Sequence, residues 1–171
     1  MRLATLILLL GISAVSAGTA NAFCYEEAGN RYGISPNLLY AISKGESSFN
    51  PIAINYNTNG SYDYGLMQIN SSWEPTLRKL GIPWGTLADP CTNVMVGAWV
   101  LSQCIRDYGY TWPAVGCYNS RTPSKRDRYA ARIARIVRQE RPLQRSEQHA
   151  SITSVSKMTQ WEEAFGIVAS R

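Results

Sequence analysis

Four cysteines constrain the fold of this 171-residue chain more than any other feature of its sequence. Their even number favours two disulfides if the chain folds in an oxidising compartment. A zinc site, the other common use of cysteine, needs several closely placed Cys or His ligands. The chain has no C-x-x-C pair, and its single histidine, His149, lies in the C-terminal tail. We therefore expect disulfides and no metal site at Cys24, Cys91, Cys104 and Cys117.

The first 22 residues indicate that the chain is exported. Arg2 precedes an apolar run from Leu3 to Val15, and the tripeptide Ala20-Asn21-Ala22 follows it. This order is typical of a secretory signal peptide with its cleavage site. A membrane anchor is the alternative, but about 15 apolar residues are too few to span a bilayer. We expect residues 1–22 to be removed and the rest of the chain to be exported.

Three disulfide pairings are possible, and helix geometry disfavours one of them. Cys91 and Cys104 flank an expected helix, which would separate them by about 20 Å at ~1.5 Å per residue. A disulfide allows at most about 7 Å between the Cα atoms. Of the remaining pairings we favour Cys24–Cys91 with Cys104–Cys117, the second of which would join two successive helices.

The charge is unevenly distributed along the chain. Residues 23–120 contain 5 basic and 7 acidic residues, whereas residues 121–171 contain 11 and 5. A basic tract can bind nucleic acid, an anionic membrane or another anionic polymer. However, Tyr129, Ile133, Ile136 and Val137 follow helical spacing, which favours the solvated face of an amphipathic helix.

The local patterns predict a mainly α domain with one small β hairpin or loop. Ser35-Pro36 resembles an N-cap with proline at the first helical position, so a helix should cover residues 36–48. Further helices are expected in residues 71–81, 93–109 and 124–141, and a short one should begin near residue 112. Between the first two helices, Asn59-Gly60 should supply the positive φ values of a tight hairpin turn. After residue 141 a polar stretch predicts a linker, and a short amphipathic helix could end the chain.

Most enzyme classes lack their motifs in this sequence. The sequence contains neither of the glycine-rich phosphate-binding motifs, G-x-G-x-x-G and G-x-x-x-x-G-K-[ST], so no nucleotide cofactor is expected. A Ser–His or Cys–His nucleophile needs a histidine near the folded core, and His149 is not there. A mechanism based on carboxylates remains.

Two acidic residues fit such a mechanism. Glu46 closes a mostly apolar helix, where partial desolvation would raise its pKa and keep its proton available. Asp63 follows the hairpin turn in a polar segment and should stay ionised. Two carboxyls with such different environments can cleave a glycosidic bond. Each residue alone also has an ordinary interpretation, as a charge at a helix end and as a turn residue.

Four segments taken together strengthen this interpretation. GESSFNPIAIN, NTNGSYDYGLMQINSSW, DPCTNVMVGAWVL and WPAVGCYNS occur in this order. The set resembles the lysozyme-like lytic transglycosylases, specifically the small exported ones associated with secretion systems, conjugation and type IV pili. The resemblance covers residues 23 to about 140. It implies a lysozyme-like fold of the soluble lytic transglycosylase type and cleavage of MurNAc-β-1,4-GlcNAc bonds in peptidoglycan.

The resemblance also implies roles for particular residues. Glu46 corresponds to the family's single acid/base, and the hydroxyl of Tyr118 is expected to orient it. The sequence departs from the family's A-Y-N-A-G pattern, with Cys117, Ser120 and Arg121 in place of small residues. The other residues expected to support the acid or line the cleft are Ser47, Met67, Gln68, Asn70 and Asn119.

The hairpin also resembles that of animal-type lysozymes, including Asp63. With this second carboxylate a retaining hydrolysis is conceivable, as in lysozyme, the type case of this chemistry. Without it, Glu46 would protonate the leaving oxygen and then deprotonate the muramic acid 6-hydroxyl, which closes a 1,6-anhydro ring. We favour the transglycosylase, with Asp63 as an electrostatic helper. A muramidase using Glu46 and Asp63 and a non-catalytic peptidoglycan-binding module are the alternatives.

The expected organisation is a signal peptide (1–22), a catalytic domain (23–141) and a tail (142–171). The enzyme should need no cofactor and should open the cell wall for a secretion, conjugation or pilus apparatus. No nucleic acid partner is expected. The apolar residues Trp161, Phe165, Ile167 and Val168 suggest that the end of the tail docks on an apparatus component, or folds back on the domain.

Overall fold

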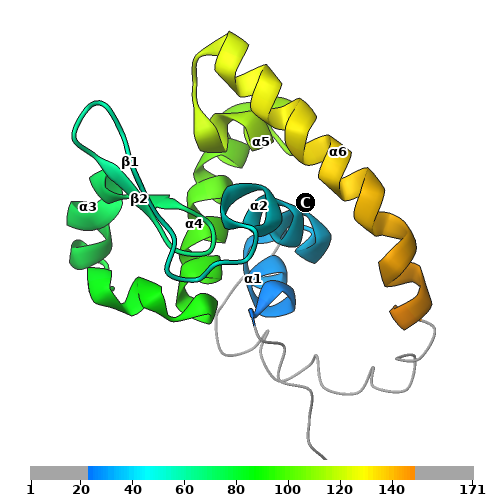
Figure 1. Cartoon of the computed structure of the whole chain (residues 1–171), viewed down its shortest axis with the longest axis horizontal. Coiled ribbons are helices and arrows are strands. Elements are labelled where there is room, and N and C mark those ends of the chain that lie inside the picture. The colour runs from blue at the N-terminus through cyan, green and yellow to red at the C-terminus, as the bar shows by residue number, and fades with distance from the viewer. Residues whose placement is uncertain (1–22, 149–171) are drawn as a thin grey trace, which may run out of the picture.

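The helix α4 (Pro90–Tyr108) forms the centre of the molecule, and the other elements pack around it (Figure 1). This computed structural model describes residues 23–148, with side chains described for residues 23–140. The helix begins where the Asp89 side chain accepts a hydrogen bond from the Thr92 N–H, which caps its first turn. Eight of its residues are buried, so the prediction of a buried central helix is confirmed.

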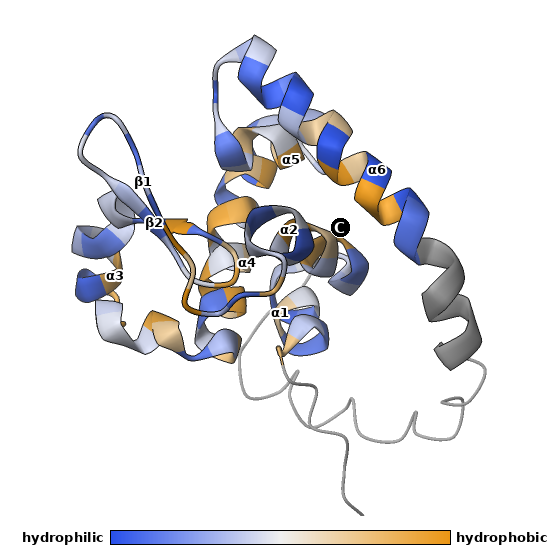
Figure 2. Ribbon diagram, in the orientation of Figure 1, coloured by the Kyte–Doolittle hydropathy of each residue, from blue (hydrophilic) through white to orange (hydrophobic). Residues whose placement is uncertain are grey.

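Four further helices surround α4. The helices α1 (Tyr25–Tyr32) and α2 (Pro36–Ser47) pack on α4, and α5 (Trp112–Asn119) packs near its end. The long helix α6 (Pro123–Gln148) lies across α5 and α2 (Figure 1). Leu39, Ile42, Leu101 and Ile133, contributed by α2, α4 and α6, are fully buried in the shared core. Figure 2 shows the hydrophobic residues gathered on α4 and α5 and along part of α6.

A small antiparallel sheet projects beside this helical body. Its strands, in spatial order, are β1 (Ile54–Tyr56), β2 (Tyr62–Tyr64) and β3 (Ile69–Asn70). The short helices η1 (Ser71–Trp73), α3 (Glu74–Lys79) and η2 (Trp84–Ala88) lead from the sheet to α4. The prediction of a mainly α fold with a small β element is confirmed, although α1 and the third strand were not predicted.

The hairpin turn differs in detail from the prediction. Of Asn59 and Gly60, only the glycine has a positive φ, at 83°. The Asn59 side chain instead accepts hydrogen bonds from the N–H and the hydroxyl of Ser61. An additional backbone bond, Asn57 N–H to the Ser61 carbonyl, closes a longer loop than a two-residue turn.

Two disulfides tie α4 to its neighbours. Cys24–Cys91 joins the start of α1 to α4, and Cys104–Cys117 joins α4 to α5. These are the pairings that the sequence favoured. The first closes a sequence separation of 67 residues and the second one of 13 residues. By the chain-entropy argument the longer loop contributes more to stability.

The C-terminal boundary also differs from the sequence prediction. The helix α6 was expected to end near residue 141, but it continues through Pro142 to Gln148. The signal peptide at residues 1–22 and the docking segment after residue 148 lie outside the described residues, so both stay predictions. None of the helices within residues 23–148 is both long and apolar enough to cross a membrane.

Candidate active site

A polar cleft of about 570 Å³ lies between the sheet and the ends of the surrounding helices. The α2 helix contributes Glu46, the hairpin contributes Asp63, and α5 contributes Tyr118 and Asn119. The remaining lining residues are Asn57, Thr58, Asn59, Ser61, Gln68, Ile69, Asn70, Ser72, Trp73, Val100 and Lys125. Amide, hydroxyl and carboxylate groups predominate, which suits a polar and hydroxyl-rich ligand such as a sugar chain.

Glu46 is placed at the cleft by the way α2 ends. The two residues that follow α2, Ser48 and Phe49, have positive φ values of 52° and 67°, which are unfavourable for side chains with a Cβ. The Phe49 ring packs against Tyr40, with ring centroids 4.8 Å apart, and lies stacked near Phe23. This aromatic packing offsets the local strain. The helix therefore ends at Ser47, one residue after the glutamate, and the chain then turns toward the sheet.

The Glu46 carboxyl is largely withdrawn from water, with 13% of its side chain exposed. Burial raises the pKa of Glu46 above its ordinary value of 4.5, and the nearby Asp63 charge raises it further. The Tyr129 hydroxyl and the Arg132 guanidinium lower it, but burial dominates. The Arg132 Nη2 atom lies 3.5 Å from Glu46 Oε1. The predicted desolvated acid is thus present.

This raised pKa makes stability depend on pH. Folding favours the protonated carboxyl, so its contribution is complete below about pH 4.5 and is lost as pH rises through the folded pKa. We expect Glu46→Gln to be more stable than wild type at neutral pH, because glutamine leaves no charge to desolvate in the folded protein. Thermal unfolding of both proteins at pH 4 to 8 should show that the difference between their stabilities grows with pH. A stability difference that does not change with pH would contradict the raised pKa of Glu46.

Asp63 is held by two asparagine side chains. Asn57 Nδ2 donates to one carboxylate oxygen at 3.0 Å, and Asn70 Nδ2 donates to the other at 2.7 Å. Asn57 comes from the hairpin loop, and Asn70 from β3 next to it in the sheet. Hydrogen bonds of this kind fix the direction of the carboxylate. Of the two, Asn70 was expected at the cleft, but Asn57 was not recognised from the sequence.

The segment from Gly65 to Gln68 fixes the floor of the cleft. The buried Asn93 side chain accepts from the Met67 N–H and donates to the Tyr64 and Leu87 carbonyls. A Cβ at Gly65 would lie 2.1 Å from Asn93 Nδ2, and the φ of Gly65 is 81°, so only glycine fits there. Asn93 is an unpredicted supporting residue, although it lies in one of the four segments that carried the family resemblance.

Gln68 lines the cleft and also forms hydrogen bonds that hold the neighbouring backbone. Its amide nitrogen donates to the Ala53 and Gly65 carbonyls, and its amide oxygen accepts from Asn55 Nδ2. These bonds tie the segment to β1. Ser47 does not line the cleft, because its hydroxyl donates to the Leu66 carbonyl at 2.7 Å. It therefore joins the end of α2 to the same segment.

Met67 and Tyr118 also differ from the expectation. Met67 is fully buried and packs against Gly97 of α4, so it belongs to the core and not to the cleft lining. The Tyr118 hydroxyl donates to the Met67 carbonyl at 2.8 Å and not to Glu46. Its expected role of orienting the glutamate through a direct hydrogen bond is therefore not seen.

Tyr129 of α6 lies where Tyr118 was expected to act. Its buried hydroxyl lowers the pKa of Glu46, although neither this hydroxyl nor Glu46 Oε1 completes a hydrogen bond of good geometry. Burial raises the pKa of Tyr129 well above 10, so the hydroxyl keeps its proton. Arg132 stacks on the Tyr129 ring and donates to the Gly45 carbonyl at 2.6 Å. The sequence placed Tyr129 on a helical apolar face but did not show what this face covers.

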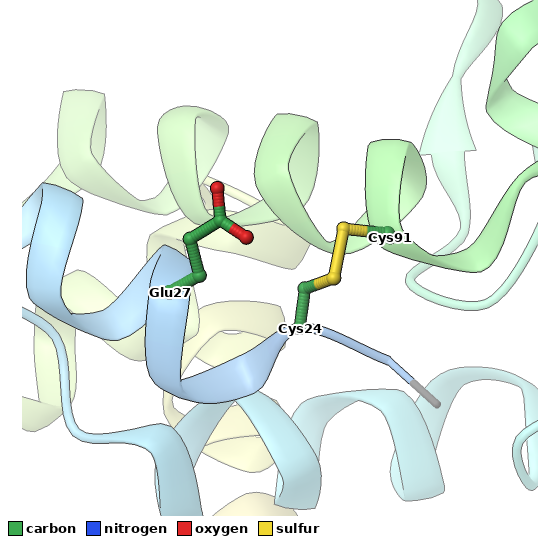
Figure 3. Close-up of side chains that lie close together, drawn as sticks. All are labelled: Cys24, Glu27 and Cys91. Carbon is green, nitrogen blue, oxygen red and sulfur yellow. A yellow bond between two sulfur atoms is a disulfide. The ribbon is translucent and has the colours of Figure 1, made fainter. Parts of the chain in front are cut away.

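Cys24, Glu27 and Cys91 form a separate cluster at the start of α1 (Figure 3). Their potential ligand atoms lie within 4.8 Å of one another. The two sulfurs are bonded to each other in a disulfide, so neither is a thiolate. A single exposed carboxylate remains, which does not make a metal site.

The sequence of this chain is similar to those of several known proteins. Residues 23–135 match the family described as "Transglycosylase SLT domain". The Invasion protein IagB of Salmonella typhimurium is 44% identical over 130 residues, which cover 75% of this chain and 81% of that protein. Protein IpgF of Shigella sonnei is 42% identical over 117 residues, which cover 68% of this chain and 77% of that protein. The X polypeptide of Escherichia coli K12 is 38% identical over 120 residues, which cover 66% of this chain and 71% of that protein.

A solved structure shares the fold. An inactive mutant of the lytic transglycosylase Slt from Pseudomonas aeruginosa superposes with a TM-score of 0.56 and 21% identity. The match covers 70% of this chain and 24% of the Slt chain, so only a part of that larger protein corresponds. The lysozyme-like fold of the soluble lytic transglycosylase type is thereby confirmed.

Proposed function

The chain belongs to the family of transglycosylase SLT domains, and we propose how its cleft cleaves peptidoglycan. It is a lytic transglycosylase, and Glu46 is its acid and base. One observation carries the assignment of Glu46. Its carboxyl is nearly buried, has a raised pKa and opens into a polar cleft that also contains Asp63. A pure binding site has no need for such a desolvated acid.

The reaction begins with proton transfer. A MurNAc-GlcNAc bond bound beside Glu46 receives the carboxyl proton on its bridging oxygen, so the bond breaks and the muramic acid ring becomes an oxocarbenium ion. The carboxylate of Asp63, held by Asn57 and Asn70, stabilises this positive charge. Because the two asparagines hold it before the reaction, little reorganisation is needed as the charge develops.

The second step regenerates the acid. The Glu46 carboxylate now accepts the proton of the muramic acid 6-hydroxyl, and this oxygen bonds to the anomeric carbon. A 1,6-anhydro ring forms without consuming water, and Glu46 is protonated again. Arg132 and Tyr129 face the carboxylate during its ionised phase and limit the cost of a buried charge.

The products provide the test. Purified sacculi digested with the protein should release muropeptides that are lighter by one water than those from a muramidase, as measured by mass spectrometry. Reducing-end products would instead assign the muramidase mechanism that uses Asp63 and water. The absence of any release, together with retained binding to sacculi, would favour the non-catalytic module.

Tyr129 should tune the pH dependence of the reaction. Since its hydroxyl lowers the pKa of Glu46, Tyr129→Phe should raise that pKa. The acid would then stay protonated to higher pH, so the alkaline limb of the pH–rate profile should shift to higher pH. Turnover at the optimum should change by less than about fivefold. Tyr118→Phe is the matched control, because its hydroxyl donates to Met67. Equal alkaline limbs in wild type and Tyr129→Phe would remove Tyr129 from this role.

We also propose that the enzyme acts in the periplasm and opens the wall for an envelope-spanning apparatus. The N-terminal segment supports export, and a relative that is named an invasion protein supports a link to such an apparatus. Mass spectrometry of the protein recovered from a periplasmic extract should find Phe23 at its N-terminus. A cytoplasmic protein that retains residues 1–22 would contradict the localisation.

A further inference from the structure

A second hollow adjoins the catalytic cleft along α6. This basic groove has a volume of about 470 Å³ and is lined by Asn119, Lys125, Arg128, Tyr129, Arg132 and Arg135. It shares Asn119 and Lys125 with the cleft, so a ligand in one can continue into the other. Its lining contains four cationic side chains and no acidic one.

The four cations share one face of α6 because they follow helical spacing. Like charges three or four residues apart destabilise a helix, so this arrangement has an energetic cost. Elsewhere on the domain, Lys44, Arg121 and Arg126 pair with Glu140, Asp107 and Asp127. Within residues 23–140, however, Lys125, Arg128 and Arg135 form no ion pair. The groove thus presents exposed positive charge beside the catalytic acid.

The proposed substrate carries the complementary charge. The sugars of a peptidoglycan strand are attached, through the lactyl group of MurNAc, to short peptides with free carboxylates. Resting on the proposed function, we infer that the basic groove binds these peptide carboxylates while the sugars occupy the cleft. Arg128 and Arg135 lie outside the lining of the catalytic cleft, so their role is to select strands that carry peptides.

The test compares strands with and without peptides. On peptide-bearing strands, Arg128→Gln/Arg135→Gln should raise KM about five- to tenfold with little change in kcat, the size expected for two exposed charge contacts. On strands whose peptides have been removed by an amidase, which leaves only the lactyl carboxylate on each MurNAc, this variant and the wild type should have the same KM. Arg31→Gln/Arg78→Gln, which removes two exposed arginines that line neither hollow, is the matched control.

A binding measurement separates this inference from the catalytic proposal. In a Glu46→Gln background, Arg128→Gln/Arg135→Gln should weaken binding to soluble peptide-bearing strands about five- to tenfold, whether or not the wild type cleaves them. If the wild type releases no products but this loss is seen, only the proposed function fails. An equal loss on both kinds of strand, or no loss beyond that of the control, would overturn the inference.

Discussion

Replacing Glu46 by glutamine should lower turnover on purified sacculi by about 10²-fold or more. Glutamine keeps the size of the side chain and some of its hydrogen bonding but has no proton to transfer to the leaving oxygen. The site makes this loss specific, because within residues 23–140 no second carboxyl occupies the desolvated position between Tyr129, Arg132 and the cleft. The measurement is the initial rate of release of anhydro products.

The control for this change is Glu26→Gln, an exposed glutamate in the first turn of α1. Its turnover should match that of wild type. Thermal unfolding of Glu46→Gln at neutral pH should show a protein at least as stable as wild type, since a buried ionisable group has been removed. Residual cleavage within a factor of a few of wild type would exclude Glu46 as the acid.

Asp63→Asn should lower turnover by roughly 10- to 10³-fold. The substitution removes the negative charge that stabilises the oxocarbenium ion. It also places an amide opposite two amide donors, Asn57 Nδ2 and Asn70 Nδ2, so at most one of these hydrogen bonds can persist in its present form. Both effects act on the charge and direction of the side chain.

A surface variant and a check of the fold show whether a loss of activity in Asp63→Asn comes from catalysis or from folding. Asp127→Asn removes an exposed aspartate that pairs with Arg126 on α6, and its turnover should be unchanged. Circular dichroism should show that Asp63→Asn retains its fold. An unchanged rate for Asp63→Asn would mean that Asp63 serves the hairpin alone, and a transglycosylase with Glu46 as its single carboxylate would remain.

The sequence allowed most of the helical framework to be predicted because its signals are local. Proline at the start of α2, the apolar pattern of α4 and the glycine after α3 act within one or two helical turns. The helix between Cys91 and Cys104 excluded one of the three disulfide pairings, and the pairing now seen was preferred because Cys104–Cys117 would join two successive helices. The short α1 was not predicted, because it is too brief to show a clear period.

The candidate acid could be found in the sequence, but its surroundings could not. Glu46 at the end of an apolar helix already indicated a desolvated carboxyl. That Tyr129 and Arg132, more than 80 residues later, would complete its environment depends on how α6 crosses α2. The basic groove arises in the same way, because a helical stripe of arginines becomes a hollow only where α6 meets α5 and the cleft.

The division between sequence and tertiary structure is clearest at Met67, Ser47 and Tyr118. The motifs predicted that all three residues lie near the active site. Their contacts could be read only from the folded chain, in which Met67 packs against Gly97 and the hydroxyls of Ser47 and Tyr118 bond to backbone carbonyls. The physical reason is that residue type and spacing set which groups are close, whereas the direction of each side chain depends on long-range packing and on which buried polar groups need partners.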